Sequence, residues 1–196
     1  MLVKLLLICF LGLAMMAASA SAAPVPVAPA GNPTIVVETT MGSFEIELYA
    51  DKAPLTTANI LGYVEDKFYD GLIVHRVIPA FMVQMGGLDA KLKNKETKDK
   101  IKNESTNGIS NKRGTVAMAR TNVADSATSQ FFVNVVDNDF LDKAKARDEV
   151  GYCVFGIVTK GMDVVDKIKD VKTETRGGTP NVPTEDVTIK SVRVKK

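Results

Sequence analysis

The 196-residue sequence has no tryptophan, one histidine and two cysteines. His75 is the single histidine, so a metal site built from several histidines is excluded. Cys153 is the only cysteine beyond the first 20 residues, and it cannot supply the missing ligands alone. We therefore expect no metal centre.

Common catalytic motifs are missing as well. The sequence contains no G-x-S-x-G elbow, no P-loop and no G-x-G-x-x-G fingerprint. A Ser/His/Asp triad would depend on His75, with no elbow to present its serine. Phosphoryl transfer, hydride transfer and hydrolysis are disfavoured, and we expect no cofactor.

An excess of charge of one sign is also lacking. The chain has 25 Lys and Arg against 23 Asp and Glu, a formal net charge of +2. A protein that binds nucleic acid usually carries a strongly basic face, because it must neutralise phosphates. Nucleic acid is therefore not an expected partner.

Only one long apolar run is present, at residues 5–18. It follows Lys4 and ends in the small residues Ala-Ser-Ala at 18–20. This pattern is typical of a secretory signal peptide at residues 1–20, with cleavage after Ala20 or, nearly as well, after Ala22. The run is shorter than the roughly 20 residues of a membrane span, so we expect no stable membrane insertion after cleavage. An uncleaved anchor is the alternative. The protein is predicted to be exported, to the periplasm or secreted.

Cys9 would leave with the signal peptide, so the mature chain would keep only Cys153. One cysteine cannot form an intrachain disulfide. Cys153 lies in the apolar string Tyr-Cys-Val-Phe, which indicates a buried and inert thiol.

The remaining chain is of single-domain length. Residues 23–33 are rich in Pro, Ala and Val without periodicity and predict an extended, flexible tether before a domain at 34–196. Apolar spacing predicts helices at 54–67 and 162–168. Strands are predicted at 35–39, 43–48, 73–78, 81–84, 114–119, 130–135, 152–158 and 187–194. Many strands without a βαβ rhythm indicate an antiparallel barrel or sandwich.

The lysine-rich segment at 91–102 has no apolar face. Glu96 and Asp99 interrupt its positive charge, which favours a solvated loop over a docking patch. Asn103-Glu104-Ser105 matches a glycosylation acceptor, which matters only in a host that glycosylates secreted proteins.

Two strings concentrate polar and apolar side chains on one face of predicted strands. In VHRVIPAFMVQ (74–84), alternation places Met82 and Gln84 on the same face, and Arg76 can join them across the bend at Pro79. In SQFFV (129–133), Gln130 and Phe132 share a face while the alternate residues point to the core. The result is a surface that is half apolar and half hydrogen-bonding.

These strings carry a resemblance to a known family. HRVIPAFMVQ, VAMAR, SQFFVNV and FLD, with TTMGSFEIELYADKAP before them and GYCVFGIVTKGMDVVDKI after, resemble the cyclophilin family of peptidyl-prolyl isomerases. The similarity covers nearly the whole mature chain and is strongest to exported bacterial members. It implies a mainly β fold, a closed eight-stranded antiparallel β-barrel capped by two α-helices, and a monomer.

The resemblance also implies roles for individual residues. Arg76 matches the family's catalytic arginine and Gln84 the residue that holds it. The walls of the proline pocket are matched by Phe81, Met82, Phe132 and Leu141. The predicted substrate-binding residues are His75, Met82, Ala119, Arg120, Gln130, Phe132, Phe140, Leu141 and Tyr152. Ala119 and Arg120 are expected to offer mainly backbone groups, and His75 and Tyr152 leave a purely structural role open.

Four positions depart from the family pattern. Phe140 stands where many members have tryptophan, so we expect weak inhibition by cyclosporin-type compounds. Arg120 replaces an asparagine, which could change the residue preferred before proline, and Tyr152 replaces a histidine. Met85 lies in a stretch that is usually glycine, and it would be strained if its φ were positive.

The expected function is peptidyl-prolyl cis-trans isomerisation in unfolded or flexible exported polypeptides. Because rotation about the X-Pro bond transfers no proton and forms no bond, the lack of a nucleophile or metal fits this reaction. A non-catalytic proline-peptide-binding or chaperone module with the same groove is the alternative. A barrel of lipocalin type is a weaker one, since it needs a hollow interior.

Overall fold

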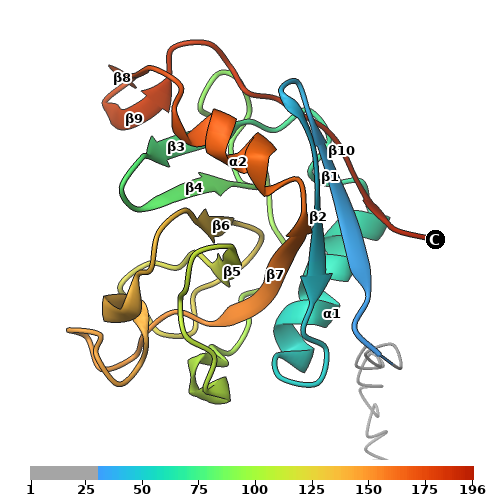
Figure 1. Ribbon diagram of the computed structural model, residues 1–196, viewed down its shortest axis with the longest axis vertical. Helices are drawn as coiled ribbons and strands as arrows, with labels where there is room; N and C mark the ends of the chain where they lie inside the picture. Colours follow the sequence, from blue (N-terminus) through green and yellow to red (C-terminus); the bar gives the residue numbers. More distant parts are fainter. Residues whose placement is uncertain (1–30) are drawn as a thin grey trace, which may run out of the picture.

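The computed structural model describes residues 31–196 (Figure 1). The predicted signal peptide and most of the predicted tether lie outside these residues. Across residues 31–196, no helix has the length and apolar character to cross a bilayer.

Eight antiparallel strands form one rolled sheet, in the order β10-β1-β2-β7-β5-β6-β4-β3. The strands are β1 (Thr34–Thr39), β2 (Gly42–Leu48), β3 (Val74–Ile78), β4 (Met82–Met85), β5 (Thr115–Met118), β6 (Phe131–Asn134), β7 (Val154–Lys160) and β10 (Ile189–Val194). Each matches a strand predicted from the apolar alternation, with ends shifted by a few residues.

The prediction of a closed barrel overstates the continuity of this sheet. Its edge strands β3 and β10 are joined by a single bridge between Ile73 and Thr188 rather than by a ladder. Continuing that antiparallel register would place β3 opposite residues 183–187 and β10 opposite residues 67–72. The two edge strands therefore run away from each other on either side of this bridge and are not paired with each other.

A second, two-stranded sheet was not predicted. It consists of β8 (Thr173–Arg176) and β9 (Thr179–Pro183), at the upper left of Figure 1. Gly177 and Gly178 connect the two strands with φ of 57° and 81°, values that glycine adopts without strain. β8 is polar and exposed, so no apolar alternation marks it.

Two helices cover the rolled sheet, α1 (Pro54–Glu65) and α2 (Met162–Lys169), and two 3₁₀ turns, η1 (Ser105–Asn107) and η2 (Asp139–Leu141), lie in the loops. Pro54 occupies the first turn of α1, where its missing N–H costs nothing. α1 ends two residues before the predicted boundary because Lys67 adopts a left-handed φ of 52°.

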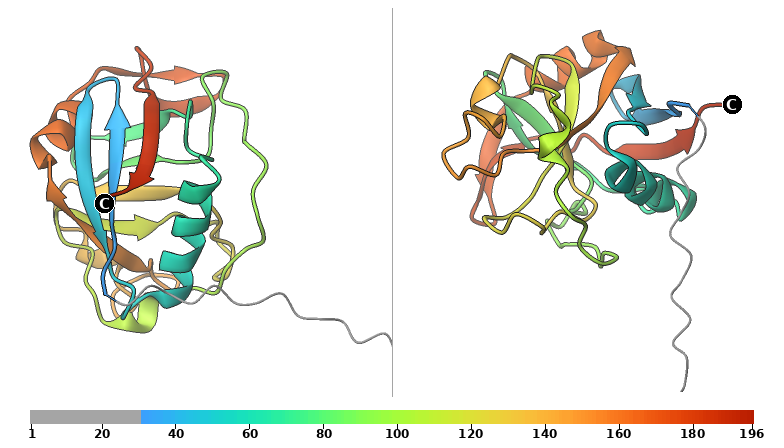
Figure 2. Two further views of the ribbon diagram at one scale, coloured as in Figure 1. Left: turned by 90° about the vertical axis from the view of Figure 1, so that its right-hand side faces the viewer. Right: turned by 90° about the horizontal axis from the view of Figure 1, so that it is seen from below.

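The lysine-rich loop runs along the outer side of α1 (Figure 2). Lys95 lies 4.7 Å from the Phe68 ring centroid, and Lys98 lies 5.3 Å from that of Tyr63 while pairing with Asp66 at 2.6 Å. Most of this loop is exposed.

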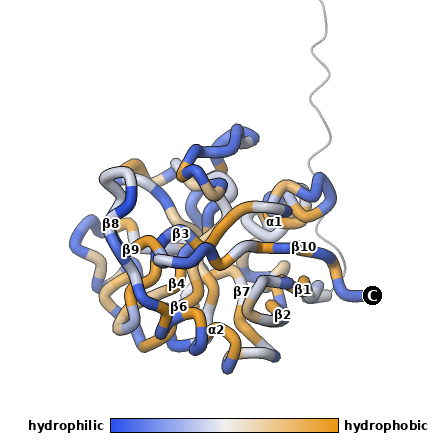
Figure 3. The backbone as a smooth tube through the Cα atoms, turned by 90° about the horizontal axis from the view of Figure 1, so that it is seen from above, coloured by the Kyte–Doolittle hydropathy of each residue, from blue (hydrophilic) through white to orange (hydrophobic). Residues whose placement is uncertain are grey.

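Side chains fill the interior of the rolled sheet. Tyr69, Phe131 and Phe155 are fully buried, with ring centroids 5.7 Å (Tyr69–Phe131) and 6.3 Å (Phe131–Phe155) apart. Each buried aromatic stabilises the fold by about 1.5–3 kcal/mol. Figure 3 shows the matching pattern, with hydrophobic segments among the strands, such as β6, and a hydrophilic C-terminal end. A filled interior does not support the lipocalin-type alternative.

Met85 is buried at the end of β4 with an ordinary extended backbone. The left-handed conformation falls instead on Gly86, with a φ of 92°. The strain considered for Met85 is therefore absent.

Candidate active site

The outer face of strands β3, β4 and β6 brings the predicted catalytic residues together. Arg76 in β3 lies directly opposite Gln84 in β4, and Gln84 lies opposite Phe132 in β6. Side chains of the neighbouring strand positions, such as Val83 and Val133, point into the core. Strand alternation thus places the predicted catalytic residues and the core residues on opposite faces, as the sequence predicted.

A hydrogen-bond chain fixes the arginine. Arg76 Nη1 donates to Gln84 Oε1 at 3.3 Å, and Gln84 Nε2 donates to Gln130 Oε1 at 3.0 Å. The guanidinium carbon of Arg76 lies 6.0 Å from the centroid of the Phe81 ring. Arg76 is therefore tied on one side and bordered by an aromatic ring on the other.

Beside Arg76 lies an apolar cluster that is separate from the main core. Its buried members are Met82, Ala117, Phe132, Leu141 and Val154, and Phe81, Ala119 and Tyr152 pack against them half-buried. The Phe132 ring lies 6.5 Å from Phe81 and 5.9 Å from Tyr152, centroid to centroid. This cluster contains the residues predicted to form the proline pocket.

Phe140 is the most exposed of the predicted groove residues, at 56%. Its ring stacks on Phe81 with centroids 5.7 Å apart and an interplanar angle of 28°. η2 carries both Phe140 and the buried Leu141, so one short turn positions two of the predicted groove residues.

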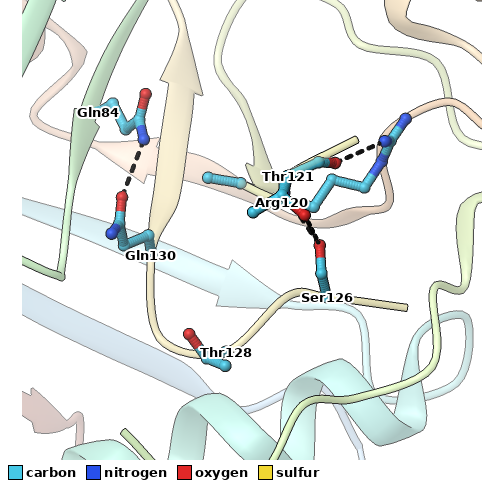
Figure 4. A pocket seen from close by; sticks show the side chains of 7 residues that line it. Gln84, Arg120, Thr121, Ser126, Thr128 and Gln130 are labelled. Carbon is cyan, nitrogen blue, oxygen red and sulfur yellow. Dashed lines mark hydrogen bonds between the residues drawn. The ribbon is translucent and has the colours of Figure 1, made fainter. Parts of the chain in front are cut away.

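A polar pocket of about 180 Å³ adjoins the apolar cluster at Ala119, which belongs to both (Figure 4). It is lined by Gln84, Ala119, Arg120, Thr121, Ser126, Thr128 and Gln130. Thr121, Ser126 and Thr128 were not predicted. They lie in the loop between β5 and β6, where no strand alternation shows which way a side chain points.

Comparison with known proteins identifies the family to which the chain belongs. The family model for "Cyclophilin type peptidyl-prolyl cis-trans isomerase/CLD" matches residues 34–194. The chain belongs to the cyclophilin family. It is a peptidyl-prolyl cis-trans isomerase, as the named relatives at about half identity also support.

Two relatives are similar to this cyclophilin over most of its length. A peptidyl-prolyl cis-trans isomerase of Acinetobacter baylyi is 54% identical over 164 residues, covering 84% of this chain and 86% of the relative. Peptidyl-prolyl cis-trans isomerase B of Escherichia coli is 52% identical over 161 residues, covering 82% and 98%.

A crystal structure supports the fold. A cyclophilin-type isomerase of Cryptosporidium parvum superposes with a TM-score of 0.69 at 19% identity, covering 84% of this chain and 98% of the other. At that identity the match concerns the fold alone.

His75 of this cyclophilin is buried rather than exposed on the surface. Its side chain is buried, and Nδ1 has no hydrogen-bond partner among the described residues. Burial lowers the pKa of His75 to about 4, so the imidazole is neutral at pH 7. This placement favours the structural role that the sequence left open.

Arg120 is one of the residues that line the polar pocket, and its guanidinium points away from Gln84 and Gln130 (Figure 4). The neighbouring Ala119 N–H donates to the Gln130 carbonyl at 3.0 Å. That these two residues offer mainly backbone groups to a bound peptide stays a prediction.

Cys153 is buried next to Thr56, with 3.7 Å between Sγ and Oγ1. Burial raises the pKa of the Cys153 thiol to about 12, which keeps it protonated and unreactive. No group of three or more His, Cys, Asp and Glu within residues 31–196 is arranged to hold a metal ion.

Proposed function

We propose that this cyclophilin acts on X-Pro bonds of exported polypeptides by non-covalent catalysis. Arg76 serves as a fixed hydrogen-bond donor, and an apolar pocket around Met82, Phe132 and Leu141 holds the proline ring. The observation that carries this mechanism is the position of Arg76, which Gln84 holds at 3.3 Å beside the buried cluster.

Free-energy magnitudes show that both parts are needed. Rotation about the amide bond has a barrier of about 18–20 kcal/mol because resonance must be broken. Shortening exchange from tens of seconds or more to milliseconds requires about four or five decades, or about 6–7 kcal/mol. One preorganised donor that strengthens in the transition state supplies about 3–4 kcal/mol. The pocket must supply the remainder.

The chemistry of the twisted amide suits these two parts. As conjugation breaks, the lone pair localises on the prolyl nitrogen, and a guanidinium donor stabilises it there. The twisted amide also loses dipole, which makes an apolar environment less costly for it than for the planar ground state. The pocket can grip the ring while the preceding residue rotates.

The substrate class follows from the apolar pocket and from a related structure. The Cryptosporidium parvum isomerase was crystallised in the presence of the dipeptide Ala-Pro, which supports proline-containing peptides as ligands here. Phe140 presents no indole N–H, so we expect cyclosporin-type inhibitors to bind weakly. Unfolded or flexible exported chains are the proposed clients.

Export is proposed from the sequence of residues 1–22 alone. Mass spectrometry of the protein recovered from the periplasm or medium would show an N-terminus at Ser21 or Ala23. Recovery of an uncleaved chain in the membrane fraction would contradict export by this route.

A protease-coupled isomerisation assay on an Ala-Pro peptide tests the mechanism. We expect Arg76→Ala to lower kcat/KM by about 10²–10³-fold, the loss of one preorganised donor. Arg193→Ala is the matched control, since Arg193 pairs with Asp70 outside the groove. Equal rates for wild type and Arg76→Ala would refute the mechanism. A wild type that binds the peptide without accelerating exchange would instead show a non-catalytic binding module.

A further inference from the structure

Arg120 is a charged residue whose side chain is only 2% exposed. Its Nε donates to the Gly151 carbonyl and its Nη1 to the Thr121 carbonyl, each at 3.0 Å, and its Nη2 pairs with the Asp148 carboxylate. A buried charge is costly unless it is paired and hydrogen-bonded, and here each guanidinium nitrogen has an acceptor. The side chain is therefore built into the fold and is not free to reach a substrate.

Asp148 connects Arg120 to the loop between η2 and β7. While Oδ2 pairs with Arg120, Oδ1 accepts hydrogen bonds from the Val150 N–H at 3.0 Å and the Gly151 N–H at 3.1 Å. The hydrogen bond from Arg120 lowers the pKa of Asp148 to about 2, so the carboxylate stays ionised at neutral pH. One carboxylate thus joins the guanidinium to the turn that precedes β7.

This turn packs closely against the backbone of Leu141 and Lys143. Gly151 has a φ of 70°, and a Cβ there would lie 2.5 Å from the backbone N of Lys143 and 2.9 Å from the carbonyl O of Leu141. The two sides of the loop are therefore in close backbone contact where Arg120 holds them.

Tyr152 follows this turn and forms the link to the proline pocket. The guanidinium carbon of Arg120 lies 4.3 Å from the centroid of the Tyr152 ring, a cation–π distance. The same ring meets Phe132 edge-on at 73°, with centroids 5.9 Å apart. Its backbone N–H donates to the Leu141 carbonyl at 2.9 Å. Tyr152 is thus held between Arg120 and two residues of the pocket.

We propose that Arg120 is a positioning residue for the proline pocket: by holding the Tyr152 ring and the Asp148 loop, it fixes the wall that Tyr152 and Leu141 form. The proposal rests on the proposed function. It differs from the sequence-based expectation that Arg120 alters the residue preferred before proline, because its guanidinium points away from Gln84 and Gln130 and is held by acceptors of the fold. Lysine cannot replace it, since an ammonium lacks the planar fork that serves three acceptors and stacks on a ring.

The first test measures kcat and KM of Arg120→Lys on a series of peptides that differ only in the residue before proline. We expect KM to rise roughly three- to tenfold, the loss of one buried cation–π contact and its charged hydrogen bonds. The rise should be the same for every peptide, while kcat changes less than KM. Arg193→Lys, which also disturbs an Arg–Asp pair, is the control and should leave both constants unchanged. A KM change that depends on the residue before proline would overturn the proposal.

A double-mutant cycle separates positioning from general loosening of the fold. In a Tyr152→Ala background, Arg120→Lys should raise KM by less than twofold, because the ring it positions is gone. Full additivity of the two changes would contradict the proposal.

A second measurement does not depend on activity. The chain has four tyrosines, and NMR of ring-labelled tyrosine, assigned with Tyr152→Phe, follows each ring. Arg120→Lys should shift the Tyr152 signal and leave those of Tyr63 and Tyr69 in place; Asp148→Asn should do the same if Arg120→Lys does not fold. An unmoved Tyr152 signal in the folded variant would refute the positioning role. An inactive wild type would refute the proposed function while leaving this readout valid.

Discussion

The Gln84 carboxamide donates from Nε2 to Gln130 Oε1 at 3.0 Å, while its other end, Oε1, accepts from Arg76. A carboxamide has one donating and one accepting end. Because Gln130 accepts from the Nε2 end, the Oε1 end of Gln84 faces the guanidinium. Gln130 therefore sets the direction in which Gln84 holds Arg76, in addition to lining the polar pocket.

Gln130→Met should break this chain at its second link. Methionine matches glutamine in length but is a poor acceptor, so Gln84 can rotate and Arg76 loses its fixed partner. We expect kcat to fall about tenfold, the value of one hydrogen bond of roughly 1–1.5 kcal/mol. Gln130→Glu keeps an acceptor and should lose less. In an Arg76→Ala background, Gln130→Met should lower kcat only slightly further. An equal fold-loss of kcat in both backgrounds would contradict the coupling between Gln130 and Arg76.

Gly87→Ala should disturb the same chain from outside it. A Cβ at residue 87 would lie 2.3 Å from Gln130 Nε2 and 2.4 Å from its Cγ, so the glutamine side chain must move. Because that side chain is flexible, we expect the fold to persist with a melting temperature near that of wild type. kcat/KM should fall severalfold. Gly108→Ala is the control, because a Cβ at residue 108 would have no atom within 4 Å. Alanine at its positive φ should lower the stability somewhat. Wild-type activity in Gly87→Ala would show that the position of Gln130 is unimportant.

His75 should make the fold sensitive to mild acid. Its folded pKa is about 4, below the unfolded value of 6.5, because burial disfavours the imidazolium. Between these values the unfolded chain binds more protons, so the free energy of unfolding falls as pH falls from 6.5 towards 4. The loss attributable to His75 is about 3 kcal/mol. Urea unfolding of wild type and His75→Gln at pH 7 and pH 4.5 should show a smaller pH effect in the variant. Parallel pH profiles for the two proteins would contradict this account.

Apolar alternation predicted the eight strands of the rolled sheet, whereas the barrel architecture was implied by the family resemblance. Val83 and Val133 alternate with Gln84 and Phe132 along their strands, and the sequence placed each pair on the correct face. The strands β8 and β9 escaped prediction because β8 is polar and exposed, and β9 contains two prolines and a single buried apolar side chain that is not proline, Val182. The incomplete closure of the sheet could not be predicted either, because the stagger between β3 and β10 depends on tertiary packing.

In the candidate site, too, residues on strands could be predicted and residues that depend on loops could not. Arg76, Gln84 and Phe132 could be predicted because they lie on strands, where spacing determines direction. The direction of the Arg120 side chain could not, because it depends on Asp148 in a loop 28 residues away. His75 was ambiguous for a related reason: the register of β3 shifts between Val74 and Arg76, so alternation does not fix its side.

Glu104 caps helix α1 from the far end of the lysine-rich loop. The N-cap residue Ala53 has no side chain to accept hydrogen bonds from the first turn. Glu104 Oε1 accepts instead from the Leu55 N–H at 3.1 Å, and Oε2 accepts from the Thr56 N–H at 2.8 Å and its hydroxyl at 2.7 Å. A carboxylate at a helix N-terminus is also favoured by the helix dipole.

Glu104→Ala should therefore lower the free energy of unfolding by about 1–2 kcal/mol, the usual value of a lost N-cap. Glu104→Gln keeps one acceptor but no charge and should lose roughly half as much. Glu96→Ala removes an exposed carboxylate from the same loop and is the matched control. Urea unfolding at pH 7 measures all three variants. Because Glu104 also anchors the end of the loop, hydrogen exchange at residues 91–102 should rise in Glu104→Ala alone. If Glu104→Ala and Glu96→Ala are equally stable, α1 does not depend on this cap.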